Sequence, residues 1–176
     1  MRPKESEAAP DFHGYINRVE GDDVVSVLER QLHEMTAFLS DISEEKSLQR
    51  YAPDKWSLRE LLSHINDGER VFLFRALWFA RGFTDPLPSY DQDVGVAGAR
   101  ADEFGWANHV AEFRAVRAAT LAFFRTLPAE NVAGSEEVWN RTGIASGNPF
   151  TVRALAYIVA GHLAHHVEVI KERYLQ

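Results

Sequence analysis

The sequence has no cysteine among its 176 residues, and this absence limits the chemistry open to it. A chain without cysteine has no disulfide, no cysteine nucleophile and no zinc or iron–sulfur site bound by thiolates. Any metal ion must be bound by histidine, aspartate, glutamate and water. Long apolar runs are also missing, since no segment approaches the roughly 20 apolar residues that span a bilayer. The N-terminus lacks the apolar core of a signal peptide, so we expect a cytoplasmic protein with no membrane partner.

Clusters of basic residues are missing too. The formal net charge is -7 at pH 7, and no run of lysine and arginine provides a surface for phosphate groups, so we expect no nucleic-acid partner. Hydrophobic residues make up 45% of the chain, which is enough for a globular domain with a sizeable core. We assign residues 1–21, which mix proline and glycine with charges, to an extended leader, and residues 22–176 to a single domain.

Four long segments have the apolar spacing of amphipathic helices. The predicted helices span residues 23–43, 57–81, 101–127 and 151–174. The second starts with a strong signal, the capping box Ser57-Leu58-Arg59-Glu60. The connections 82–102 and 130–150 are long, contain glycine and proline, and show no convincing pair of strands. The sequence therefore predicts an all-α protein, a four-helix bundle with long interhelical connections.

The fourth predicted helix carries two histidines in the middle of its apolar face. His162 and His166 are four residues apart, so their imidazoles project from successive turns and can converge on one ion. His64 lies on the apolar face of the second helix, and Gly68 one turn later leaves room over its imidazole. The three histidines form a candidate metal site with positions open for water or substrate. The same spacing also allows structural histidines that are hydrogen-bonded to backbone and tyrosine.

Other polar and aromatic residues are weaker candidates. Asp67 and Asp93 could orient a histidine, contact bound water or act as a base. Four arginines are either anchors for an anionic substrate or ordinary ion-pair partners: Arg70, Arg75, Arg114 and Arg117. Four tryptophans either line a pocket or belong to the core, which is commoner: Trp56, Trp78, Trp106 and Trp139. We expect His33 at the surface and His109 in a structural role, and the sequence leaves open whether His109 or His165 contributes to the site.

Two segments resemble the signature segments of the DinB/YfiT-like metalloenzyme family. They are Lys55-Trp56-Ser57-Leu58-Arg59-Glu60-Leu61-Leu62-Ser63-His64-Ile65-Asn66-Asp67-Gly68-Glu69-Arg70 and Gly161-His162-Leu163-Ala164-His165-His166. Three further stretches are similar to ones common in that family: Tyr90-Asp91-Gln92-Asp93, Phe113-Arg114 and Trp139-Asn140-Arg141-Thr142-Gly143. The resemblance covers the sequence from the first predicted helix to its end. It implies an up-down-down-up bundle, often a homodimer, in which His64, His162 and His166 bind a divalent metal ion.

The resemblance also implies a metal-dependent enzyme that acts on a small molecule. Nickel or zinc is the expected metal, with iron or manganese as alternatives. Some relatives are S-transferases or isomerases that use a low-molecular-weight thiol such as bacillithiol, mycothiol or glutathione, and we expect a thiol-dependent S-transferase. The first alternative is a metal-dependent hydrolase, in which Asp67 or Asp93 helps to deprotonate water. The second is a non-catalytic stress-response bundle for binding or dimerisation.

Overall fold

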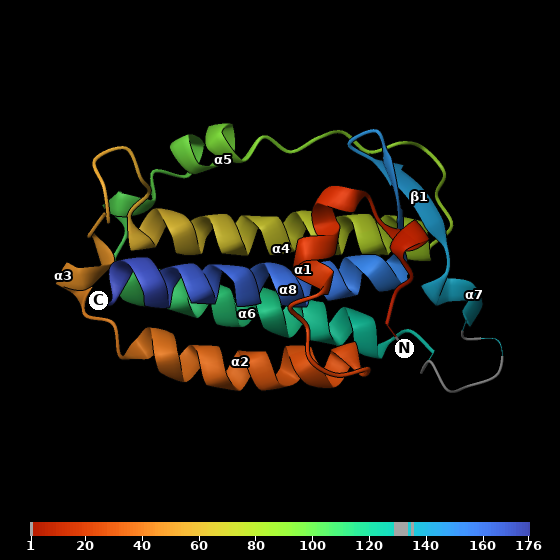
Figure 1. Cartoon of the computed structure of the whole chain (residues 1–176), viewed down its shortest axis with the longest axis horizontal. Helices are drawn as coiled ribbons and strands as arrows, with labels where there is room; N and C mark the ends of the chain where they lie inside the picture. Colours follow the sequence, from red (N-terminus) through yellow and green to blue (C-terminus); the bar gives the residue numbers. More distant parts are fainter. Residues whose placement is uncertain (1, 129–133, 135) are drawn as a thin grey trace.

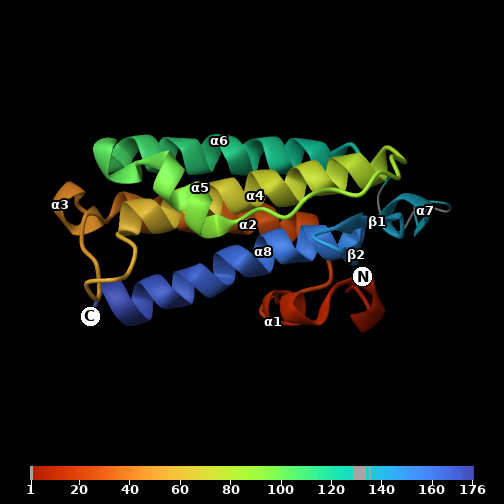
Figure 2. The ribbon, with the colours of Figure 1, turned by 90° about the horizontal axis from the view of Figure 1, so that it is seen from above.

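The computed structural model describes residues 2–128, 134 and 136–176. Four long helices lie side by side as a bundle in Figures 1 and 2: α2 (Val24–Ser40), α4 (Leu58–Ala80), α6 (Trp106–Arg125) and α8 (Val152–Val169). Helices α2 and α8 run in one direction, and α4 and α6 run in the opposite direction (Figure 1). The predicted four-helix bundle and its up-down-down-up order are confirmed. No helix in the described residues is long and apolar enough to cross a membrane.

Shorter elements connect the long helices and cover their ends. The chain starts with η1 (Glu5–Glu7), η2 (Pro10–Phe12) and α1 (His13–Ile16). The connections contain α3 (Glu44–Ser47), α5 (Gln92–Ala99), η3 (Ala101–Glu103) and α7 (Glu136–Trp139), and the π-helical turn η4 (Ile170–Tyr174) follows α8. The predicted third helix is thus split, because η3 precedes the start of α6 at Trp106. Helix α5 packs on α4, so the first long connection returns across the bundle.

The second long connection contains a β-hairpin, so the prediction that no strands pair there is wrong. Strands β1 (Thr142–Ala145) and β2 (Asn148–Thr151) pair antiparallel. Ser146 and Gly147 between them have φ values of 53° and 76°, and positive φ at both positions is typical of a two-residue type I′ turn. Leu87 forms two backbone hydrogen bonds with this hairpin. The two long connections therefore lie side by side.

The leader is helical rather than extended, and it packs closely on α8. A Cβ atom on Gly161 of α8 would lie 1.9 Å from the carbonyl oxygen of Tyr15. Only glycine allows the two backbones to approach so closely. Glu7 is buried and accepts hydrogen bonds from Thr151 and Arg153 at the start of α8. The leader is therefore part of the packed structure, and α1 lies against α8 in Figure 2.

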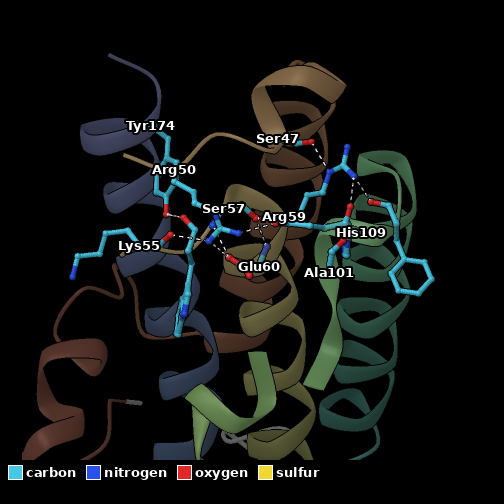
Figure 3. Close-up of polar contacts among 12 residues, drawn as sticks. Ser47, Arg50, Lys55, Ser57, Arg59, Glu60, Ala101, His109 and Tyr174 are labelled. Atoms are coloured by element: carbon cyan, nitrogen blue, oxygen red, sulfur yellow. Dashed lines mark hydrogen bonds and ion pairs between the residues drawn. The ribbon is translucent and has the colours of Figure 1, made fainter. Parts of the chain in front are cut away.

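Polar contacts fix the beginning of α4 (Figure 3). The Ser57 hydroxyl accepts a hydrogen bond from the Glu60 backbone at 3.1 Å, and the Glu60 carboxylate accepts one from the Ser57 backbone at 2.8 Å. The predicted capping box is confirmed. Arg50 donates to the same carboxylate at 2.5 Å, and the Tyr174 hydroxyl donates to the carbonyl of Trp56 at 2.7 Å. The last turn of the chain is thereby tied to the start of α4.

A buried ion pair joins three of the long helices. The guanidinium of Arg117 on α6 donates to both carboxylate oxygens of Glu69 on α4, each at 2.8 Å. It also donates to the side-chain oxygen of Gln31 on α2 at 2.8 Å. Arg117 and Glu69 are both buried, so neither charge is solvated well by water. Removal of one partner would leave the other as an uncompensated buried charge.

We predict that Arg117→Met lowers the free energy of unfolding by about 3–5 kcal/mol, because the Glu69 charge loses its partner. Urea denaturation measures this change. The control is Arg125→Met, which removes the half-exposed pair between Arg125 and Glu29 and should change the free energy of unfolding far less, because water solvates both charges. Equal losses in the two variants would contradict the structural role of the Arg117–Glu69 pair.

Candidate metal centre

The three predicted histidines lie together where α4 contacts α8. The Nε2 atom of His162 lies 3.1 Å from Nε2 of His64 and 3.1 Å from Nε2 of His166. One ring nitrogen from each residue lies within 4.8 Å of the other two. His64 and His162 are buried and His166 is half-buried. Within the described residues, this is the only cluster of three or more potential metal-binding side chains at such distances.

Hydrogen bonds alone do not explain this arrangement. A ring nitrogen has one site in the ring plane, which holds either a proton or a lone pair. Nε2 of His162 can therefore make only one of its two close contacts as a hydrogen bond. The Nδ1 atoms of His64 and His166 are buried and have no hydrogen-bond partner among the described residues. These Nδ1 atoms stay unpaired with or without an ion at the Nε2 atoms, but three purely structural histidines would also leave one of the two close Nε2 contacts without a hydrogen bond, which costs free energy.

A divalent metal ion fits the three nitrogens. In a tetrahedral site with metal–nitrogen distances of about 2.0–2.1 Å, the ligand nitrogens are about 3.3–3.4 Å apart. The two 3.1 Å separations around His162 are close to this value. Neutral imidazole nitrogens suit zinc, nickel and iron alike. Three protein ligands also leave a position open, as in catalytic rather than structural metal sites.

Burial keeps the three imidazoles neutral. Burial, followed by repulsion from neighbouring histidines, lowers the pKa of His162 to about 3 and that of His166 to about 2. Burial also lowers the pKa of His64, although the charges of Asp67 and Asp93 oppose this shift. A neutral imidazole offers a lone pair, so the rings can bind a cation at neutral pH without first losing protons.

Neighbouring residues hold the rings in place. A Cβ atom on Gly68 would lie 2.9 Å from Cε1 of His162, so the room at Gly68 is taken by His162 of the facing helix and not by His64 as predicted. The Tyr15 ring of the leader packs edge-on against His162 at a centroid distance of 5.3 Å. The Trp56 ring lies 5.0 Å from the His64 ring. The histidines are therefore enclosed by aromatic side chains.

Two cavities adjoin the histidines. The first, which we call the His162 cavity, has a volume of about 530 Å³, and its lining includes His64, His162, Arg75, Tyr15 and Ser146. The second, the His166 cavity, has a volume of about 360 Å³, and its lining includes His166, Trp56, Asp93 and Tyr174. Helix α5 contributes to both, through Gln92 and Asp93 respectively. The first volume is in the range typical of small-molecule sites.

The two candidate aspartates have different surroundings. Asp67 accepts a hydrogen bond from the Tyr90 hydroxyl at 3.3 Å and pairs with Arg70 at 3.1 Å. Asp93 is exposed at the His166 cavity, and its carboxylate has no hydrogen-bond or ion-pair partner among the described residues. Both carboxylates are near enough to His64 to act on its pKa. Asp93 is thus the freer of the two to exchange a proton.

Only one of the four candidate arginines lines a cavity beside the histidines. Arg75 lines the His162 cavity. Arg70 pairs with Asp67 and Glu112 on the surface, and Arg117 is the buried partner of Glu69. Arg114 lies in a separate groove between α2 and α6. Arg70 and Arg117 are therefore ordinary ion-pair partners, and Arg114 is remote from the histidines.

The remaining candidates lie outside the cluster. His165 packs beside Tyr15, and His33 is exposed as predicted. His109 is structural, since its buried ring donates from Nε2 to the Ala101 carbonyl at 2.9 Å (Figure 3). Trp106 and Trp139 belong to the core, Trp78 stacks on Phe83, and Trp56 lines a cavity. That Ser146 and Tyr15 line the His162 cavity was not predicted from the sequence. The Ser-Gly pair at 146–147 was the available signal for a turn at this position.

Comparisons with known proteins return a family and a structural relative. The sequence pattern of the DinB superfamily matches residues 27–170. Among solved structures, YfiT from Bacillus subtilis is similar with a TM-score of 0.70 and 16% sequence identity, over 98% of this chain and 90% of that chain. YfiT is described as a probable metal-dependent hydrolase with an unusual four-helix bundle topology. No curated protein matches the sequence. Neither match supports the expected thiol-dependent S-transferase.

We predict that the metal-free protein loses stability as the pH falls from 7 to 5. The unfolded chain binds protons at histidine below about pH 6.5, whereas folded His162 and His166 stay neutral until about pH 3 and about pH 2. Each of these two histidines should therefore remove about 2 kcal/mol from the free energy of unfolding at pH 5. Urea denaturation of EDTA-treated protein at both pH values measures the loss. His166→Gln should make the pH dependence shallower, and an unchanged dependence would contradict the assignment.

Proposed function

The chain belongs to the DinB superfamily, and from this premise we propose that it is a metal-dependent hydrolase of a small molecule. His64, His162 and His166 bind one divalent transition metal ion, with nickel or zinc preferred over iron or manganese. The observation that carries the proposal is the convergence of three neutral, enclosed ring nitrogens. A divalent ion held in this way supplies Lewis acidity and lowers the pKa of water toward neutral.

The residues around the histidines supply the other parts of the mechanism. The Asp93 carboxylate accepts the proton of the attacking water, because it is free of partners and lines the cavity that reaches His166. Asp67 is engaged with Tyr90 and Arg70, so it orients the Tyr90 hydroxyl. The rings of Tyr15 and Trp56 limit the access of bulk water to the histidines.

Hydrolysis is preferred over thiol transfer for one reason. The description of YfiT as a probable metal-dependent hydrolase supports it, whereas none of the described residues that line the two cavities points to a thiol. The two reactions are separated by a simple assay. A hydrolase turns over 4-nitrophenyl esters without an added thiol, and a transferase requires bacillithiol, mycothiol or glutathione for its rate.

We predict that protein purified without a histidine tag contains about one equivalent of a transition metal, and that His162→Ala contains none. Plasma mass spectrometry measures the content. Metal removal should also lower the melting temperature of the wild type, because an ion that binds only the folded state stabilises it by about 2.7 kcal/mol at 100 times its Kd. The melting temperature of His162→Ala should not respond to added metal.

The matched control for this experiment is His109→Gln. His109 is as buried as His162, at 5% exposure for both, but it lies outside the cluster. This variant should lose stability and keep its metal. Metal content that survives His64→Ala would contradict the three-histidine site. A wild type that binds no nickel, zinc, iron or manganese would favour the non-catalytic bundle.

We predict that Asp93→Asn lowers kcat by about 10²–10⁴-fold with unchanged metal content, because the amide cannot accept the proton. Asp67→Asn should have a smaller effect, since its carboxylate is already paired with Arg70. Ester hydrolysis and plasma mass spectrometry on the same samples measure both quantities. A larger loss of kcat in Asp67→Asn than in Asp93→Asn would reverse the assignment of the base.

A further inference from the structure

Arg75 differs from the other buried arginines of the described chain. Four arginines are buried, and three of them pair with a glutamate: Arg59 with Glu44, Arg117 with Glu69, and Arg153 with Glu7. Arg75 has no carboxylate within ion-pair distance among the described residues, although it is only 5% exposed. Its Nη2 atom donates to the Pro88 carbonyl at 3.1 Å and to the Ser146 hydroxyl at 3.0 Å, and both acceptors are uncharged.

An unpaired buried charge is costly, so this arrangement requires an explanation. Buried charges are normally paired with an opposite charge, because they lose their hydration. Burial lowers the pKa of Arg75, but a guanidinium keeps its proton in proteins at neutral pH. A cation–π contact with Phe72 stabilises the charge only weakly, because the guanidinium lies 6.0 Å from the centre of the ring. An anion from solution would compensate the charge.

Two nitrogens of the Arg75 guanidinium have no partner among the described residues. Arg75 lines the His162 cavity together with His64 and His162. Its Nε and Nη1 atoms make no hydrogen bond to the described residues, and they are not among the enclosed unpaired atoms. They are therefore accessible to a ligand. Arg75 is seven residues after Gly68, so it lies two turns and about 10 Å further along the same face of α4.

The two long connections hold the guanidinium in position. Pro88 belongs to the first connection and Ser146 to the hairpin turn, and both segments lie over the end of α4 in Figure 1. Ser146 has a positive φ of 53°, a conformation that glycine and asparagine adopt more readily. The hydroxyl of Ser146 is what contacts Arg75. The fold thus fixes one nitrogen of the guanidinium and leaves the others free, which is the preorganisation expected of a binding group.

We propose that Arg75 is the anion-binding residue of the His162 cavity and that the substrate carries a carboxylate, which Arg75 binds while the scissile bond lies at the histidines. That the bound molecule is a substrate rests on the proposed function. That Arg75 binds an anion does not. The geometry of a guanidinium group matches both carboxylate and phosphate, since it can donate two parallel hydrogen bonds to either. Asp11 also lines the cavity, and its negative charge favours a singly charged carboxylate over a doubly charged phosphate.

The test measures the binding of benzoate and its neutral analogue benzamide to EDTA-treated full-length protein by calorimetry or NMR titration. Metal-free protein is used so that a carboxylate cannot bind to the metal instead. We expect benzoate to bind the wild type about 10- to 100-fold more tightly than benzamide, the factor typical of hydrogen bonds to a charged group. Arg75→Gln should lose this preference, and Arg75→Lys should keep part of it.

The matched control is Arg114→Gln, which removes the same charge at an exposed site in another groove and should bind benzoate like the wild type. The wild-type preference tests the proposal even if Arg75→Gln fails to fold. Equal binding of benzoate and benzamide, or benzoate binding unaffected by Arg75→Gln, would overturn it. Tighter binding of phenyl phosphate than of benzoate would overturn the choice of carboxylate. A protein that binds benzoate through Arg75 but binds no metal would refute the proposed function and leave the anion site intact.

Discussion

The close approach of α4 and α8 at Gly68 is the constraint on which the site depends. The ring of His162 occupies the space that any side chain at position 68 would take. Gly161, next to His162 in the chain, allows the backbone of the leader to cross α8 and brings the Tyr15 ring against the His162 ring. Two glycines thus allow a polar ring to be enclosed at a helix contact. Enclosure in turn keeps the imidazole neutral, which metal binding requires.

The buried polar side chains of the bundle are of two kinds. Most are paired across elements, as in the contact of Arg117 with Glu69, and these pairs fix how the helices and the leader pack. Arg75, His64 and His162 have no carboxylate partner among the described residues, and all three line the His162 cavity. Unpaired polar groups that gather in a cavity are typical of functional sites, because a folded chain bears their cost only where a ligand relieves it.

The parts of the fold that depend on local pattern were predictable from the sequence. Apolar periodicity gave the four long helices, the capping box gave the start of α4, and the i, i+4 spacing gave the pair His162 and His166. His64 was a candidate partner because it lies on the apolar face of the second predicted helix, and the family resemblance strengthened this prediction, because spacing along one helix does not show which residue of a neighbouring helix it meets. Periodicity also could not show that Arg75 is buried without a carboxylate partner, because its surroundings are formed by the hairpin turn and the first connection, which pack beside it.

The three clustered histidines and the walls of the cavity come from different kinds of structure. The three histidines lie on long helices, whose positions are fixed by the core. Much of the His162 cavity is lined by the leader, the first connection and the hairpin turn, at Phe12, Tyr90 and Ser146. Changes in length or composition in these segments can alter the shape of the cavity without repacking the helices. The same scaffold can therefore change the shape of its cavity during evolution while the three histidines keep their positions.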